Sequence, residues 1–244
     1  MWKKWMACML VVTMLLPVGI QIFAGQKSSK TNIRKTKNKY IVLSENKEQF
    51  KEVNRRFESF GDEYIENLKK KNISYNEMTE KEAEELKKNS DIISVEENIE
   101  LHGNDGQVAP KDVAADWNLG MIHGENVDTS VREKVRVAVI DSGIDECEGL
   151  EVKERYNLVP SENDVLPVYD DITGHGTTVA SVIAGEEVKG RGTVGINKNV
   201  ELYSIKVMDG DNTAPLTRIV EGIYKAIEYK VDIINMSFGT TVNS

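Results

Sequence analysis

Residues 137–145 read Val-Ala-Val-Ile-Asp-Ser-Gly-Ile-Asp, an apolar run that ends in an acid and a glycine. A continuous run of Val and Ile is typical of a strand that is buried on both faces of a sheet. In open α/β sheets, functional groups collect at the carboxyl ends of the strands. We therefore expect Asp141 to face a crevice there. The alternative is that its side chain only caps the next segment.

The sequence around this run predicts a parallel sheet. Val/Ile-rich segments recur at 200–207 and 231–236, and segments with helical spacing lie at 177–184 and 216–229. Buried strands that alternate with helices indicate a parallel sheet that is covered on both faces. Residues 108–244 are therefore predicted to form an α/β domain.

The preceding residues, 39–103, predict a small α+β unit. Its expected strands are 39–43, 64–68, 73–78 and 92–95. One helix is expected after Asn46, which has Gln49 three residues on, and a second after Thr79, which has Glu82 three residues on. Both pairs fit a capping box. The order βαββαβ is typical of a ferredoxin-like sandwich.

Polar segments flank this unit. Residues 104–107 are polar and glycine-containing, which predicts a linker between the two folded parts. Residues 25–38 carry several Lys and Arg residues and no acid, so we expect a solvated basic linker. Attraction of this segment to an anionic surface is the alternative.

Residues 1–24 have the pattern of an export signal. Lys3 and Lys4 precede a long apolar run, and Ala24 ends a small-residue cleavage pattern. The alternative is a retained membrane anchor, because the run is close to the ~20 residues that a spanning helix needs. We expect a cleaved signal peptide and a secreted protein, with association with the cell surface as a second possibility.

Composition excludes some classes of function. A formal net charge of −9 and a pI near 5.1 argue against a nucleic-acid partner, because phosphate binding needs a basic face. No glycine-rich phosphate loop of the Gly-x-Gly-x-x-Gly or Gly-Lys-Ser/Thr type follows a predicted strand, which argues against a nucleotide-binding domain.

Two further segments carry chemistry. Residues 174–177 read Gly-His-Gly-Thr at the start of a predicted helix, and a histidine between two glycines can reach out with little crowding. A structural or merely exposed histidine is the alternative. Residues 235–239 read Asn-Met-Ser-Phe-Gly. They predict either an ordinary strand end or an exposed edge that pairs with an extended peptide.

In their order and spacing, these three segments resemble the subtilisin family of serine peptidases. Asp141 matches the family's triad aspartate, and His175, 34 residues later, matches the triad histidine. Ser237, Phe238 and Gly239 match residues that line the family's substrate cleft. The resemblance covers about residues 108–244. It implies a subtilisin-like parallel sheet flanked by helices, and hydrolysis of polypeptide substrates by an Asp-His-Ser triad.

Residues 39–103 resemble the inhibitor-type propeptide of the same family. In the family, this domain assists folding and leaves its tail in the active-site cleft until autoprocessing. The resemblance therefore implies that the chain's own propeptide is a partner of its catalytic domain.

The sequence also departs from the family's pattern. It contains no Gly-Thr-Ser-Met-Ala segment, so the chain as given is expected to lack the serine nucleophile, to be inactive, and to form an incomplete sheet. Residues 146–150 replace a stretch in which the family often carries a calcium ligand. Calcium is possible but no matching ligand motif supports it, and we predict neither a metal site nor a required cofactor.

We therefore interpret the chain as a secreted serine endopeptidase precursor. The alternative is a non-catalytic truncated protein whose first unit acts as a protease inhibitor or folding assistant.

Overall fold

The computed structural model describes residues 37–60, 63–103, 133–159, 167–168, 170–186, 188 and 194–240. The expected signal peptide, nearly all of the basic linker and the linker at 104–107 lie outside these residues. Among the residues described, no helix is long and apolar enough to cross a membrane.

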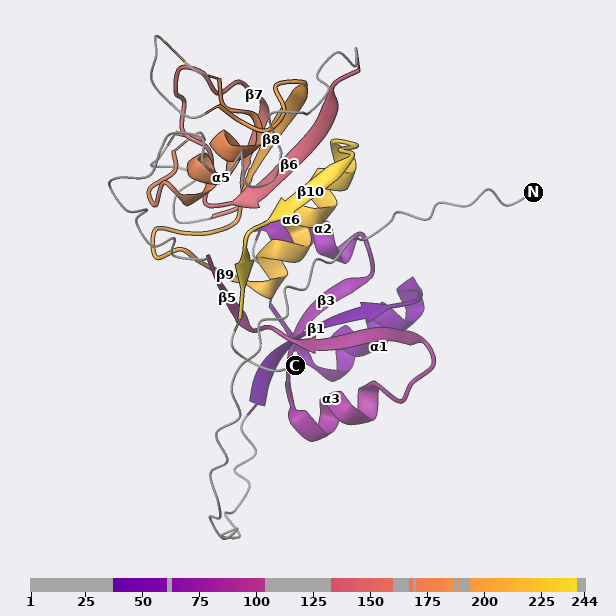
Figure 1. The fold of residues 1–244 in the computed structure, drawn as a ribbon. Coiled ribbons are helices and arrows are strands. Elements are labelled where there is room, and N and C mark those ends of the chain that lie inside the picture. Colours follow the sequence, from indigo (N-terminus) through magenta and orange to yellow (C-terminus); the bar gives the residue numbers. More distant parts are fainter. Residues whose placement is uncertain are drawn as a thin grey trace, which may run out of the picture. The chain divides into compact units, whose positions relative to one another are not determined.

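A four-stranded sheet forms the centre of the later part of the chain (Figure 1). Its strands, in spatial order, are β10 (Ile233–Met236), β6 (Val135–Asp141), β8 (Val200–Lys206) and β7 (Val152–Asn157). All three strand pairings are parallel. The predicted parallel sheet is thus confirmed.

Helices cover this sheet on both faces. Successive residues of a strand point to opposite sides, so one strand can contact a helix on each face. The helices are α5 (His175–Ala184) and α6 (Leu216–Glu228). Val137 and Val139 of β6 belong to the same buried cluster as Ala180 of α5. Ile140 of the same strand belongs to a second buried cluster, with Ile219 of α6. A strand buried on both faces needs the continuous apolar sequence that β6 has.

The earlier part of the chain contains an antiparallel sheet with helices packed on it. Its elements are β1 (Lys37–Ser44), α1 (Lys47–Arg56), β2 (Glu58–Ser59), α2 (Glu63–Lys69), β3 (Ile73–Thr79), α3 (Glu80–Leu86) and β4 (Ile92–Glu97). The spatial order of its strands is β2-β3-β1-β4. Its core is a cluster of buried apolar side chains that includes Val42, Val53, Met78 and Val95.

Both helix starts predicted from capping residues in this part are confirmed. The Asn46 side chain accepts a hydrogen bond from the Gln49 backbone N–H at 2.9 Å. Thr79 and Glu82 form a reciprocal capping box, in which each side chain accepts from the other residue's backbone N–H. These pairs satisfy N–H groups that a helix leaves without partners in its first turn.

The predicted strand at 64–68 is wrong, because these residues lie in helix α2. Ile65 and Leu68 are both fully buried, and side chains three residues apart lie on one face of a helix. A short apolar run fits a strand and a buried helix equally well. The strand that pairs with this side of β3 is instead the two-residue β2.

A third, small sheet joins the two parts. Strand β5 (Glu100–Gly103) pairs antiparallel with β9 (Thr213–Pro215) on one side and with β11 (Phe238–Gly239) on the other. Just before β5, the Asn98 side chain accepts a hydrogen bond at 2.9 Å from the backbone N–H of Thr217. Helix α6 begins after Pro215, whose side chain cannot cap it, so Asn98 supplies an acceptor from elsewhere in the chain.

Helix α6 also buries a carboxyl group. Glu221 is only 5% exposed and accepts a hydrogen bond from the Asn67 side chain of α2. Burial raises the pKa of Glu221 above its usual value, and the neighbouring Glu228 adds to this, while Asn67, Lys225 and Lys70 oppose it. The folded chain therefore holds this proton more tightly than the unfolded chain does.

The raised pKa gives a pH-dependent stability with a defined sign. As pH rises from below the unfolded pKa to above the raised folded pKa, ionisation of Glu221 lowers the free energy of unfolding. We expect Glu221→Gln to remove this loss, so that the variant is more stable than the wild type at pH 7 but not at pH 4. Urea unfolding followed by circular dichroism at both pH values measures this difference. The control is Glu228→Gln, whose side chain is 70% exposed; equal effects of the two substitutions would contradict the prediction.

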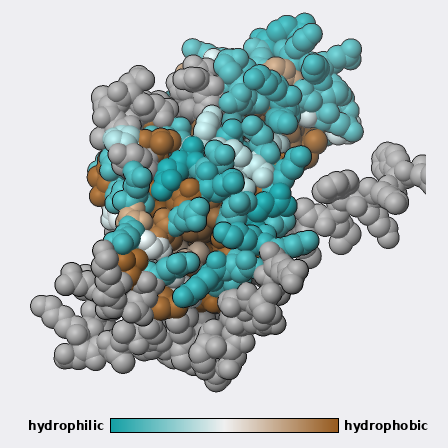
Figure 2. Space-filling view, turned by 90° about the horizontal axis from the view of Figure 1, so that it is seen from above, coloured by the Kyte–Doolittle hydropathy of each residue, from teal (hydrophilic) through white to brown (hydrophobic). Residues whose placement is uncertain are grey.

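Apolar side chains also reach the surface. Figure 2 shows them among hydrophilic side chains on the face that is seen from above. Strand β10 lies at the edge of the described sheet, and its Ile233 and Met236 are 52% and 41% exposed. Exposed apolar edge strands tend to pair with other strands.

Candidate active site

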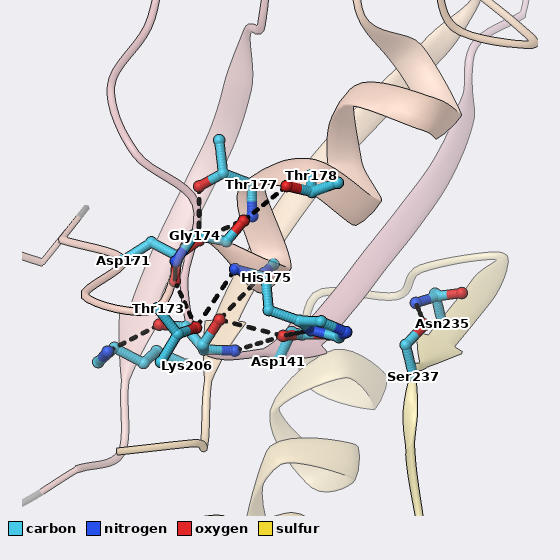
Figure 3. Close-up of polar contacts among 12 residues, drawn as sticks. Asp141, Asp171, Thr173, Gly174, His175, Thr177, Thr178, Lys206, Asn235 and Ser237 are labelled. Atoms are coloured by element: carbon cyan, nitrogen blue, oxygen red, sulfur yellow. Dashed lines mark hydrogen bonds and ion pairs between the residues drawn. The ribbon is translucent and has the colours of Figure 1, made fainter. Parts of the chain in front are cut away.

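The carboxylate of Asp141 lies at the carboxyl end of β6, and its residue is 1% exposed. Its Oδ1 lies 2.7 Å from Nδ1 of His175 (Figure 3). The two side chains are 34 residues apart in sequence. They meet because strand β6 ends where helix α5 begins.

His175 is the first residue of α5, and its side chain is 16% exposed. The residue before it, Gly174, has φ +72°, a left-handed conformation that glycine adopts readily. The imidazole is thus directed at the buried carboxylate through Nδ1, while the side chain keeps partial access to solvent. Such a pair can take up and release a proton.

Asp171 holds the start of α5, a role that the sequence analysis missed. One of its carboxylate oxygens accepts the backbone N–H of Gly174 at 3.0 Å, and the other accepts that of Thr177 at 2.8 Å. Asp171 is 5% exposed, and Figure 3 shows its carboxylate beside Gly174 and Thr177. An aspartate three residues before the N-cap residue Gly174 can accept hydrogen bonds from nearby backbone N–H groups, so this role could have been found from the sequence.

Gly176 allows the helix to approach the strand end closely. A Cβ atom on Gly176 would lie 2.1 Å from the carbonyl oxygen of Gly143 and 3.1 Å from Cβ of Asp141. No side chain fits in this space. The second glycine of the Gly-His-Gly segment is therefore needed for close packing, a reason that the sequence did not reveal.

Ser142 links the Asp141 carboxylate to the backbone of Gly176 by hydrogen bonds, and it is fully buried. Its backbone N–H and its hydroxyl both donate to Asp141 Oδ1, at 2.7 and 3.1 Å. Its hydroxyl oxygen accepts the backbone N–H of Gly176 at 3.0 Å. The Oδ1 atom that faces His175 is thus held by two further donors.

The other candidate residues, Ser237, Phe238 and Gly239, lie at and after the end of β10. The Ser237 hydroxyl accepts a hydrogen bond from the Asn235 side chain at 2.9 Å (Figure 3). Phe238 and Gly239 form β11, whose partner strand is β5. The position at which we expected an extended peptide to pair is therefore occupied by residues 102–103 of the same chain.

Within the described ranges, no three or more His, Cys, Asp or Glu side chains are grouped so that they could hold a metal ion.

Comparison with known proteins places this site in context. Residues 132–244 match the sequence model of the subtilase family. The thermostable alkaline protease of Halalkalibacterium halodurans is 31% identical over 189 residues, which cover 77% of this chain and 49% of that protein. Subtilisin E of Bacillus subtilis is 29% identical over 246 residues, which cover 99% of this chain and 61% of that protein. The chain thus spans about half to three fifths of the length of these relatives.

A solved structure shows the same fold. The epidermin leader peptide processing serine protease of Staphylococcus aureus, in its S393A mutant, aligns with a TM-score of 0.56 and 18% sequence identity. The alignment covers 83% of this chain and 51% of that structure.

Proposed function

Residues 132–244 belong to the subtilase family, and from this premise we propose that the chain contributes Asp141 and His175 to a serine endopeptidase that hydrolyses peptide bonds through an Asp-His-Ser triad. The observation that carries the proposal is the 2.7 Å contact between the buried Asp141 carboxylate and Nδ1 of His175. This contact leaves Nε2 as the atom of the imidazole that can exchange a proton with a nucleophile.

The two side chains have different roles in the proposed reaction. Nε2 of His175 takes the proton of the serine hydroxyl as the oxygen attacks the peptide carbonyl, and later gives it to the leaving amine. Asp141 accepts the proton on Nδ1, which fixes the tautomer and the orientation of the ring, and its charge stabilises the imidazolium. The proposed reaction needs no cofactor, because these side chains and the serine supply the nucleophile and the proton transfers.

Residues 108–244 contain no Gly-Thr-Ser-Met-Ala segment, and two serines near the Asp141–His175 pair or the proposed cleft are held in other contacts. Ser142 is buried with its hydroxyl bonded to Asp141 and Gly176, and the Ser237 hydroxyl is bonded to Asn235. These contacts support the expectation that the 244-residue polypeptide by itself does not hydrolyse peptides. In this proposal, peptide hydrolysis requires a nucleophile that residues 1–244 do not supply.

The test compares two preparations. The native gene product, isolated from its source, is expected to cleave fluorogenic peptides and to react with a serine-directed fluorophosphonate. The polypeptide of residues 1–244 is expected to do neither. A native gene product that is inert to both reagents would overturn the proposed function. Peptide hydrolysis by residues 1–244 alone would contradict the prediction that these residues lack the nucleophile.

The proposal extends to residues 39–103 as an inhibitory propeptide. Its support is β5, the last strand of this unit, which pairs with both β9 and β11. An extended substrate would use the same main-chain groups, so residues 100–103 would block it. In this proposal Ser237, Phe238 and Gly239 bind substrate, and the maturation cut falls within the stretch from about Leu101 to Pro110.

Gly103→Pro tests this blocking role. The Gly103 N–H donates to the Asn212 carbonyl at 2.9 Å, and proline has no N–H to donate. Leaving that acceptor without its partner costs about 1–3 kcal/mol, which corresponds to a roughly 5- to 150-fold weaker inhibition constant. The measurement is inhibition of the mature native protease by the polypeptide of residues 25–107. His102→Ala is the control, because its side chain is 60% exposed; an unchanged inhibition constant for Gly103→Pro would count against β5 as the blocking segment.

The proposed location is extracellular. It rests on the basic start, apolar run and Ala24 of the sequence, together with the likeness to subtilisins. N-terminal sequencing of protein from the culture medium is expected to begin at Gly25 or within a few residues of it. Protein that keeps Met1 and sediments with membranes would contradict this location.

A further inference from the structure

Lys206 is a buried cation to which the proposed reaction gives no role. It is the last residue of β8 and is 1% exposed, and it is the largest of the described side chains that are fully buried. Its ammonium donates to the carbonyl oxygen of Ser142 at 2.7 Å (Figure 3). Burying an ammonium is costly, so a smaller apolar residue would serve better if the position only filled the core.

Lys206 is the first of three consecutive residues that hold the backbone beside Asp141. The carbonyl oxygen of Asp141 accepts the N–H of Val207 at 2.7 Å and that of Met208 at 3.1 Å. The carbonyl oxygen of the next residue, Ser142, accepts from the Lys206 ammonium. Residues 206–208 therefore fix the carbonyl groups on both sides of the Ser142 Cα atom.

The orientation of Ser142 matters because its hydrogen bonds join the end of β6 to the start of α5. Its N–H and hydroxyl both donate to Asp141 Oδ1, and its hydroxyl oxygen accepts the N–H of Gly176, the residue after His175. The residue that follows Ser142 is Gly143, which has φ +113° and no side chain to restrict the peptide between them. The ammonium restrains this peptide where the glycine would otherwise let it turn.

We propose that Lys206 is a positioning residue for the Asp141–His175 pair. Its ammonium holds the peptide between Ser142 and Gly143, and Ser142 then directs two donors at the carboxylate oxygen that faces Nδ1. The carboxylate is thereby fixed in the orientation that holds the imidazole in one tautomer. The expected change in kcat rests on the proposed function, whereas the expected change in the tautomer of His175 does not.

The test measures the tautomer of His175 in the full chain with ¹⁵N-labelled histidine. Lys206→Met keeps the length of the side chain and removes the ammonium. Arg218→Met is the matched control, because the Arg218 side chain is 12% exposed and its guanidinium donates to the Val207 carbonyl at 2.8 Å. His175→Gln assigns the signal among the three histidines.

In the wild type, the ¹⁵N shifts are expected to show the proton of neutral His175 on Nδ1, because Asp141 accepts it there. Lys206→Met is expected to shift the population towards the tautomer mixture of an unpaired imidazole, and Arg218→Met is expected to leave it unchanged. In the native gene product, Lys206→Met is expected to lower kcat about 10- to 100-fold with little change in KM, the loss that follows displacement of a catalytic group by about 1 Å.

An unchanged His175 tautomer in folded Lys206→Met overturns the inference, even if the variant is less stable. If circular dichroism shows that Lys206→Met does not fold, Ser142→Ala decides instead, because it removes the hydroxyl through which the lysine is proposed to act. An unchanged tautomer in that variant also overturns the inference. The proposed function fails separately, if the tautomer responds as expected but the native gene product hydrolyses no peptide.

Discussion

His175→Ala is expected to abolish peptide hydrolysis and self-processing of the native gene product. The imidazole is the group that accepts the nucleophile's proton in the proposed reaction, and alanine supplies no base. Asp141→Asn is expected to lower kcat by about 10⁴-fold, the loss typical of serine protease triads whose histidine is held in the wrong tautomer. An amide nitrogen that faced Nδ1 would donate a proton where the carboxylate accepts one.

The measurement is hydrolysis of a fluorogenic peptide, together with the length of the chain after expression. Asp232→Asn is the matched control for the aspartate. Asp232 is exposed and pairs with Arg136 at 2.9 Å, so its substitution is expected to leave the rate nearly unchanged. Normal maturation of either His175→Ala or Asp141→Asn would mean that the pair is not the catalytic one.

Gly176→Ala is expected to have the largest effect on stability. Its Cβ would lie 2.1 Å from the carbonyl oxygen of Gly143, and this contact is to backbone, which cannot turn aside as a flexible side chain can. Overpacking of this kind costs typically about 1–3 kcal/mol, and we expect the upper end of that range. Because the helix must move away from the strand, the hydrogen bond between Asp141 and His175 should lengthen, and peptide hydrolysis should fall with it.

Gly174→Ala separates this packing effect from backbone strain. Gly174 has a left-handed conformation, but a Cβ atom there would meet no atom within 4 Å. Its substitution is expected to cost about 1–2 kcal/mol from strain alone. Urea unfolding of the two variants gives the comparison. A smaller loss of stability for Gly176→Ala than for Gly174→Ala would contradict the packing argument.

The sequence by itself determined the features that depend on near neighbours along the chain. The Val/Ile run before Asp141 predicted a strand covered on both faces, and β6 has Val139 on one face and Ile140 on the other. The Asn46 and Thr79 capping residues predicted two helix starts, because a cap and its acceptor or donor lie within three residues of each other. Local periodicity failed for 64–68, where the run is too short to distinguish a strand from a helix. It also did not predict β7 (Val152–Asn157), whose sequence lacks a continuous apolar run.

The tertiary structure decided the features that depend on which distant segments meet. A lysine at the end of a Val/Ile run gives no sign of being buried, and Lys206 becomes so because β8 pairs with β6 and brings its ammonium to Ser142. The need for glycine at position 176 arises from Gly143, which lies 33 residues earlier. The pairing of β5 with β11 joins residues more than 130 positions apart. A local sequence pattern indicates which face of a helix or strand is buried. Contacts between distant segments depend on how whole elements pack against each other, and no local pattern predicts that packing.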